Sequence, residues 1–361
     1  MQILIAILVF CVIIIIHELG HFLAAKACGI YVKEFALGMG PVIFRKQGKE
    51  TAYVIRLLPI GGSCSMEGEN GGYEDEELDN EGHVIERSVN PRAFNRKPVW
   101  QRMIVILAGP LMNLILGYFV IVLSLCTSSA VASTTIASFR EQPLSNVQLM
   151  EDDRILAIDN MPVFSASDIS YKLQSSDRKN ENGNLIFDFK VKRKGETVLL
   201  KDVEFTTTEK EDGTTGIYFD FYVYRLEKNF TNIAGQSFME TLSTGRLIIM
   251  TLFDMLRGKY GLNDMSGPVG VVSVVSQSVS YGLSTFLNLV SLITINVGVF
   301  NLLPIPALDG CRFLFLLIEA IRRKPTKPEV EGMVHVAGFL LLMLLMVVVT
   351  VNDIVRLVNG G

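Results

Sequence analysis

Long runs of apolar residues, interrupted by few charges, dominate the pattern of this chain. Four of them each hold roughly twenty apolar residues or more, the length that a helix needs to cross the hydrocarbon core of a bilayer. These runs occupy residues 1–27, 99–126, 285–310 and 332–355. The pattern therefore predicts a polytopic α-helical membrane protein with four transmembrane helices.

The segments between these runs carry other patterns. Residues 28–98 contain strand-like pieces such as Tyr53–Leu57, predicting a β-hairpin, and then an acidic insertion at Glu67–Glu86. Residues 128–207 show the strand, turn and helix signals of one small α+β domain. Residues 208–284 predict a linker with an amphipathic helix that is too polar to span and suited to a membrane surface.

Basic residues give an orientation. Lys and Arg are frequent in the loop that follows the first run and in the segment that follows the third, whereas both termini hold almost none. The positive-inside rule places those two loops in the cytoplasm. Both termini and the α+β domain are then expected outside the membrane, on the extracytoplasmic side.

Composition agrees with a membrane protein, because 49% of the residues are hydrophobic and the mean hydropathy is positive. The net charge of −4 offers no basic surface for nucleic acid. The five cysteines are scattered, which indicates neither a disulfide framework nor a thiolate metal site. The N-terminus lacks the basic region and cleavage site of a signal peptide, so we interpret it as a retained transmembrane helix.

The first polar residues of the opening apolar run are His17, Glu18 and His21. Charged and metal-binding side chains are costly in hydrocarbon and usually functional there. A helix places residues i and i+4 on one face, so His17 and His21 can bind one metal ion while Glu18 acts as a general base, as in H-E-x-x-H metalloproteases. His17 lies roughly 22 Å into the helix, which predicts a site in the cytoplasmic half of the membrane.

Zinc needs a third protein ligand, and the best candidate is Asp309. It follows Asn301–Leu308, a stretch with two prolines that cannot continue a helix. Unwound backbone at membrane depth is tolerated where it is buried in protein or lines a cavity. The alternative is that Asp309 caps the helix expected to begin near Cys311. We interpret His335, in the last run, as a helix-packing or interfacial residue outside the site.

Taken in order, HELGH in the first run, Gly109-Pro110-Leu111-Met112-Asn113 in the second, the α+β domain and the Asn301–Gly310 segment resemble the bacterial site-2 proteases of the RseP/RasP type. The resemblance covers nearly the whole chain. It implies Zn²⁺ held by His17, His21 and Asp309, with Glu18 as the base. It also implies that Asn301 and Pro306 lie beside the metal and that these two and Asn113 serve substrate binding.

The same resemblance implies a PDZ domain over residues 128–207, whose expected partners are the C-termini of pre-trimmed substrates. It implies hydrolysis of peptide bonds within single-pass transmembrane proteins, either anti-sigma factors or signal-peptide remnants, in the inner membrane of a bacterium. The β-hairpin has two open interpretations. Its edge near Tyr53–Leu57 could accept an extended substrate as an added strand, or it could only cover the inner mouth of the site.

The sequence disfavours two other functions. A membrane metalloprotease of another class, with a Glu as the third ligand, is disfavoured because no second acidic element of that kind lies in a span. A catalytically silent membrane scaffold that displays a PDZ domain is disfavoured because a scaffold needs no buried base such as Glu18.

Overall fold

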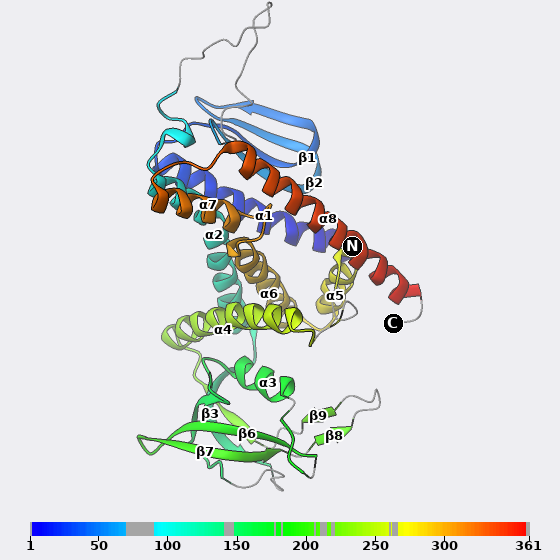
Figure 1. The fold of residues 1–361 in the computed structure, drawn as a ribbon. Helices are drawn as coiled ribbons and strands as arrows, with labels where there is room; N and C mark the ends of the chain where they lie inside the picture. The colour runs from blue at the N-terminus through cyan, green and yellow to red at the C-terminus, as the bar shows by residue number, and fades with distance from the viewer. Residues whose placement is uncertain are drawn as a thin grey trace, which may run out of the picture. The chain divides into compact units, whose positions relative to one another are not determined.

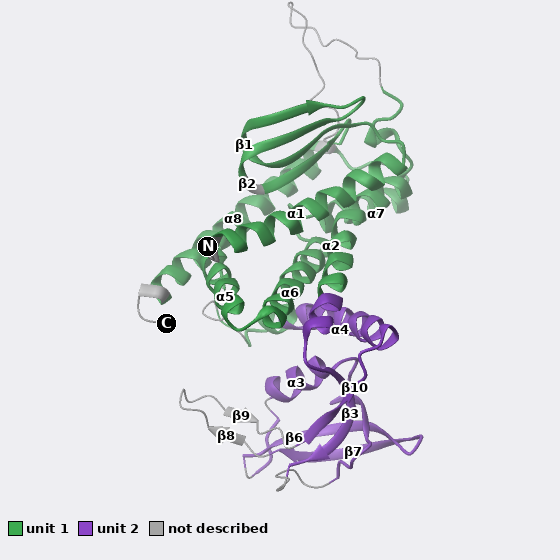
Figure 2. Cartoon of the chain, turned by 180° about the vertical axis from the view of Figure 1, so that it is seen from behind, with its two compact units in different colours: residues 1–120, 252–361 green, residues 121–251 purple. Residues whose placement is uncertain are grey.

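In the computed structural model, the chain forms two compact units (Figures 1 and 2). One holds residues 1–120 and 252–361, and the other holds residues 121–251. The structure describes residues 2–69, 90–140, 148–176, 178–181, 183–205, 207–209, 215–217, 221–259, 261 and 266–358. Most of the acidic insertion predicted at Glu67–Glu86 lies outside the described residues.

Four helices among the described residues are long and apolar enough to cross a membrane. They are α1 (Gln2–Ala27), α2 (Val99–Thr127), α6 (Leu283–Leu302) and α8 (Pro328–Val358). A shorter apolar helix, α5 (Pro268–Ser280), precedes α6. The prediction of a polytopic α-helical membrane protein with four spans is confirmed at this level.

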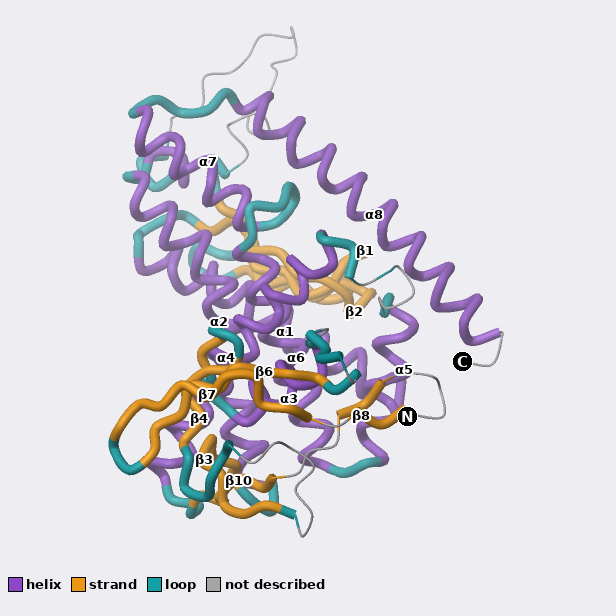
Figure 3. The backbone as a smooth tube through the Cα atoms, turned by 60° about the horizontal axis from the view of Figure 1, so that its bottom comes forward, coloured by secondary structure: helices purple, strands orange, loops and turns teal. Residues whose placement is uncertain are grey.

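The third span is shorter than the predicted 285–310. Helix α6 ends at Leu302, and α7 (Asp309–Arg322) begins only after a six-residue connection. Pro304 and Pro306 lie in this connection, where neither can donate a backbone hydrogen bond to a helix. A loop then joins α7 to α8, the long helix visible in Figure 3.

Small residues let α2 approach both α1 and α6. A Cβ added to Gly20 of α1 would lie 2.4 Å from the Ala108 carbonyl oxygen of α2. A Cβ added to Gly117 of α2 would lie 2.4 Å from a side-chain carbon of Ile295 in α6. Membrane helices associate through such close backbone contacts. Helix α2 is thus the element against which α1 and α6 are both packed.

The predicted hairpin is formed by β1 (Val32–Gln47) and β2 (Ala52–Met66), and it lies against α1 (Figure 1). Both strands bend, so that Phe35 pairs with Tyr53 on one side and with Cys64 on the other. Tyr53 also pairs with Lys46. The expectation of an open edge near Tyr53–Leu57 is therefore wrong, because Tyr53–Ile55 has a neighbour on both sides.

The edges of this sheet are instead the segments Val42–Gln47 and Gly62–Met66. Each pairs with one neighbouring segment, and no other strand among the described residues pairs with either. The bend arises where Gly38, Gly40 and Gly61 adopt positive φ angles, which glycine tolerates best. The hairpin thus becomes a sheet four segments wide with two open edges.

The second unit contains one six-stranded antiparallel sheet, ordered β10-β3-β4-β6-β7, with β5 paired to β4. Its hydrophobic core includes Phe187, Phe189 and Phe205, all buried. The predicted module ended at residue 207, but β10 from the predicted linker extends the sheet. The elements are β3 (Val131–Phe139), β4 (Arg154–Ile158), β5 (Met161–Pro162), α3 (Ala166–Ser175), β6 (Leu185–Arg193), β7 (Glu196–Phe205) and β10 (Phe221–Leu226).

The amphipathic helix predicted in the linker is α4 (Phe230–Leu256). Two polar residues of α4 contact α3. Arg246 forms an ion pair with the fully buried Asp168 of α3, and Ser243 donates a hydrogen bond to the same carboxylate. Phe238, Leu242 and Phe253 of the same helix are about half exposed. The remaining short elements are η1 (Phe94–Arg96), β8 (Thr207–Glu209) and β9 (Thr215–Ile217).

Candidate metal centre

Three side chains from two distant parts of the chain meet in the first unit. His17 and His21 are one turn apart on α1, and Asp309 is the first residue of α7. The Asp309 Oδ2 atom lies 3.0 Å from His17 Nε2 and 3.3 Å from His21 Nε2. The two Nε2 atoms are 3.2 Å apart. The three potential ligand atoms therefore form a nearly equilateral triangle.

This triangle fits a tetrahedral metal ion. Zinc binds histidine nitrogen at about 2.0–2.1 Å and carboxylate oxygen at about 2.0–2.2 Å, which puts two such donors of a tetrahedral site about 3.3 Å apart. The measured edges of 3.0, 3.2 and 3.3 Å match that spacing. Three protein ligands leave a fourth position for water or substrate, which is the arrangement of catalytic zinc sites.

The alternative role of Asp309, capping α7, does not occur in the structure. Leu308 occupies the N-cap position, and no side chain caps the helix there. The Asp309 Oδ2 atom is buried and accepts no hydrogen bond. A buried carboxylate oxygen that faces two imidazole nitrogens is a donor set that a bound cation would satisfy, so these residues fit a metal ion.

A carbonyl of α2 orients the ring of His21. The Nδ1 atom of His21 lies 2.8 Å from the Val105 carbonyl oxygen, which can only accept a hydrogen bond. Nδ1 therefore carries the proton, and Nε2 presents its lone pair toward Asp309 and His17. Helix α2 thus selects the tautomer that can bind a metal.

Asn113, also on α2, serves His17 in the same way. Its side-chain amide is fully buried and lies 3.3 Å, measured from Nδ2, from His17 Nδ1, while its Oδ1 atom has no partner. With the amide oxygen and nitrogen exchanged, His17 Nδ1–H can donate to Oδ1. In that orientation Asn113 orients the ring of His17, and its predicted role in substrate binding stays a prediction.

Glu18 follows His17 directly and faces the edge segment of the hairpin. A Cβ added to Gly62 would lie 2.9 Å from Glu18 Cγ, so β2 touches the candidate base. Cys64, two residues further along β2, is also buried, and burial raises the pKa of its thiol. The edge segment of β2 therefore brings Gly62 beside the candidate base.

Two further predicted residues lie in or next to the connection between α6 and α7. Asn301 donates from Nδ2 to the Val297 carbonyl oxygen of its own helix, at 3.0 Å. Pro306 packs against Gly338 of α8, where an added Cβ would lie 2.1 Å from the proline Cβ. Their predicted role in substrate binding stays a prediction.

One residue near the site is not among the predicted site residues. The sequence indicates a helix-packing or interfacial role for His335, but its Nδ1 atom accepts a hydrogen bond from the Ala307 backbone N–H, at 3.1 Å. Ala307 lies two residues before Asp309. A histidine in an otherwise apolar helix was the available signal, and the partner could not be inferred because it is 28 residues away in an irregular segment.

Comparison with known proteins places these residues in a family context. Residues 5–345 match the family described as peptidase family M50. The chain is 31% identical to the regulator of sigma-W protease RasP of Bacillus subtilis, with 97% of each chain covered. It is 32% identical to the zinc metalloprotease RasP of Shouchella clausii, over 97% of each chain. With the zinc metalloprotease RasP of Bacillus licheniformis it shares 33% identity, over 97% of this chain and 98% of the other.

Proposed function

The chain belongs to peptidase family M50, and from that premise we propose that it hydrolyses peptide bonds within transmembrane segments as an intramembrane zinc metalloendopeptidase. Its relatives along nearly the whole chain are named zinc metalloproteases, and one is named a regulator of sigma-W protease. The observation that carries the proposal is the triangle of His17, His21 and Asp309 between helices of a membrane protein. We propose these three as the zinc ligands.

The proposed chemistry divides between the metal and Glu18. Zinc, when bound by these ligands, would supply Lewis-acid activation of a water molecule and of the scissile carbonyl. Glu18 accepts the proton of the attacking water and delivers it to the leaving amine nitrogen. Val105 and Asn113 hold the two imidazoles in the tautomer that leaves Nε2 unprotonated.

A substrate helix has to unwind before its backbone can be attacked, because its peptide groups are hydrogen-bonded internally. Unpaired peptide groups in lipid cost several kcal/mol each, on the order of a hydrogen bond in an apolar medium. We propose that the open edge Gly62–Met66 pairs with the unwound substrate strand and offsets that cost. Its support is that Gly62 on this edge contacts Glu18, so a strand added there would pass beside the base.

The expected setting is the cytoplasmic membrane of a bacterium, with both termini and the second unit on the extracytoplasmic side. The hairpin and the loop between α7 and α8 are then cytoplasmic. We propose that the second unit is a PDZ-like domain that contacts the C-termini of pre-trimmed substrates. Its support is a compact antiparallel sheet with one helix, α3, beside it.

Replacing Glu18 and Asp309 separately tests this function. Glu18→Gln is expected to keep zinc in the purified protein and to lose cleavage of a transmembrane reporter, because only the base is removed. Asp309→Asn is expected to lose both. The matched control is Glu196→Gln, an exposed carboxyl of β7, which should behave as wild type. Zinc content is measured by atomic emission, and cleavage by electrophoresis.

The same experiment separates the rival functions. If Glu18→Gln and Asp309→Asn both cleave as well as wild type, the protease proposal fails at this site. If wild type and the variants all lack activity but retain reporter binding, the catalytically silent scaffold is the better description. Co-purification with a Glu18→Gln variant, which can hold a substrate without cutting it, would then identify the bound proteins.

A further inference from the structure

The connection between α6 and α7 determines where the Asp309 carboxylate points, and its backbone is held unusually. Ala307 has a φ of +75°, a left-handed conformation that residues other than glycine seldom adopt. Such a conformation persists where the surrounding structure imposes it. Two of the six residues of the connection are prolines, which removes two of its backbone donors.

Contacts from helix α8 hold Ala307 in its left-handed conformation. His335 accepts the Ala307 N–H at Nδ1, and Gly338, three residues later on the same face, leaves the space that Pro306 fills. A side chain at position 338 would collide with Pro306, since an added Cβ lies 2.1 Å from the proline Cβ. Two consecutive residues of the connection, Pro306 and Ala307, are therefore each in contact with one residue of α8.

The protonation state of His335 follows from its contact. Because Nδ1 accepts a hydrogen bond, the proton of the neutral ring lies on Nε2. That Nε2 atom is buried without a hydrogen-bond partner among the described residues. Other atoms of His335 border a cavity of about 610 Å³, which Arg102, Glu319 and Glu331 also line.

Helix α8 is otherwise loosely packed, with only 11% of the residues in its most apolar stretch buried. Another polar contact of α8 lies far along the helix, where the Asp353 carboxylate accepts hydrogen bonds from the backbone of Gly267 and Gly270. The contacts of His335 and Gly338 with the connection are thus separate from the contact that Asp353 makes.

We propose that His335 and Gly338 are positioning residues for the metal site, which set the conformation of the Pro304–Leu308 segment and thereby aim Asp309 at the two imidazoles. The inference rests on the proposed role of Asp309 as a zinc ligand and adds a second requirement to it. A residue that orients a ligand typically changes metal affinity by about 10–100-fold when it is replaced.

The test compares acceptor geometries at position 335. His335→Asn places its amide oxygen where Nδ1 was and should retain zinc affinity close to wild type. His335→Phe preserves the ring that lies beside Phe315 but has no acceptor, and zinc should bind roughly tenfold or more weakly. Affinity is measured on the purified full chain in detergent, by competition with a chromogenic chelator. The visible spectrum of the cobalt-substituted protein reports the ligand geometry and should change only in His335→Phe.

Gly338→Ala supplies an independent perturbation of the same segment, and Gly332→Ala is its matched control on the same helix. A Cβ at position 338 collides with Pro306, whereas one at position 332 meets nothing within 4 Å. We expect Gly338→Ala to weaken zinc binding as His335→Phe does, and Gly332→Ala to match wild type. A His335→Gln variant, whose acceptor lies one bond further out, replaces His335→Phe if that protein does not fold, and it should show the same weakening.

Asp309→Ala is included to separate two kinds of failure. If Asp309→Ala binds zinc as tightly as wild type, the ligand set itself is wrong. If Asp309→Ala loses zinc while the His335 and Gly338 variants retain wild-type affinity and cobalt spectra, the ligand stands and the positioning role is overturned. Equal loss in His335→Asn and His335→Phe would also overturn it, because the acceptor would then be irrelevant.

Discussion

At the scale of single residues, the candidate metal centre depends on a glycine as well as on the side chains that could bind the metal. Gly109 of α2 lies directly beneath His21, and an added Cβ would be 2.3 Å from the His21 Nε2 atom. No heavy atom can approach that closely without displacing the ring. The glycine is therefore required for the imidazole to occupy the position that faces Asp309.

Replacing Gly109 by alanine is expected to weaken zinc binding roughly tenfold or more, because the methyl group displaces one ligand ring. Cleavage of a transmembrane reporter should fall with it. The control is Gly235→Ala in α4, where an added Cβ meets nothing within 4 Å. Chelator competition measures the effect, and wild-type zinc affinity in Gly109→Ala would contradict the close contact.

The residues of the site were predictable to different degrees. His17 and His21 follow from helical spacing alone, because i and i+4 share a face wherever the helix is placed. Asp309 followed from the cost of a carboxylate in an apolar segment. The substrate-binding role of Asn113 stays a prediction, and its contact with His17 could not be predicted, because 96 residues of sequence separate the two and no local pattern acts over that separation.

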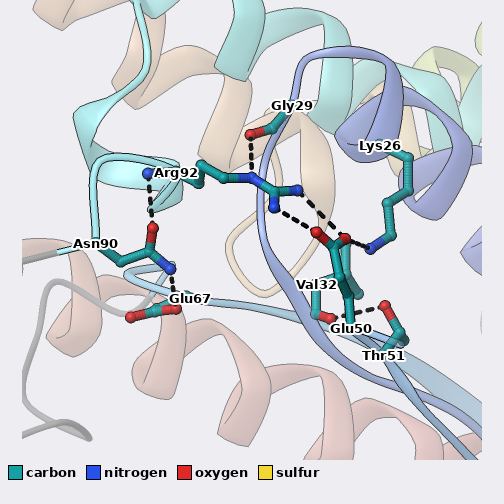
Figure 4. A network of polar contacts seen from close by, with 8 residues as sticks. All are labelled: Lys26, Gly29, Val32, Glu50, Thr51, Glu67, Asn90 and Arg92. Atoms are coloured by element: carbon teal, nitrogen blue, oxygen red, sulfur yellow. Dashed lines mark hydrogen bonds and ion pairs between the residues drawn. The ribbon is translucent and has the colours of Figure 1, made fainter. Parts of the chain in front are cut away.

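At the scale of elements, a polar network joins the end of α1 to the hairpin and to the segment before α2 (Figure 4). Glu50, at the hairpin turn, accepts hydrogen bonds from Lys26, at 2.7 Å, and from both terminal nitrogens of Arg92. Arg92 also donates to the Gly29 carbonyl oxygen. One carboxylate thus links three segments around the C-terminal end of α1, the helix that carries His17 and His21.

These contacts give Glu50 a defined pH dependence. Hydrogen bonds from Arg92 and Lys26 lower the pKa of the carboxyl to about 2, from an ordinary value of 4.5. A carboxyl with a lowered pKa in the folded state stabilises the protein fully above its unfolded pKa and stops doing so as the pH falls through its folded pKa. The stabilisation should therefore be lost between about pH 4.5 and pH 2.

We expect Glu50→Gln to melt at a lower temperature than wild type at pH 7, and the difference to disappear as the pH falls from 4.5 to 2. The effect should be small and should decrease in high salt, because the group is exposed to solvent. Thermal melting in detergent at a series of pH values measures it. A constant difference across that range would mean that the charge of Glu50 is not what stabilises the fold.

Element boundaries were predicted well where a local signal marks them. The helix predicted from the apolar run at residues 99–126 is α2, which ends at Thr127. The third span was predicted too long, since hydrophobicity continues through Leu302–Leu308 while the two prolines end the helix. The hairpin was also predicted, but its open edge was not, because only the bending of β1 and β2 decides which segments pair twice.

At the scale of the whole molecule, the proposed topology makes a prediction about accessibility. A cysteine introduced at Lys46, on the hairpin, should react with a membrane-impermeant maleimide only after the membrane is opened. A cysteine at Glu196, in β7, should react in intact spheroplasts. Both are introduced into a chain whose five native cysteines are replaced by serine. Labelling is followed by the shift in electrophoretic mobility, and the reverse pattern would invert the proposed orientation.

The sequence by itself determined the helices that can span a membrane, the two histidines on one helical face and the break before Asp309, because each depends on neighbours within a few residues. Only the tertiary structure decided that α1 and α7 bring three potential ligand atoms to within 3.3 Å of one another, that α2 contacts both rings, and that α8 contacts Pro306 and Ala307. Those contacts join residues far apart in the chain. Their geometry depends on helix packing, where a glycine or a carbonyl oxygen counts only once the facing helix is in place.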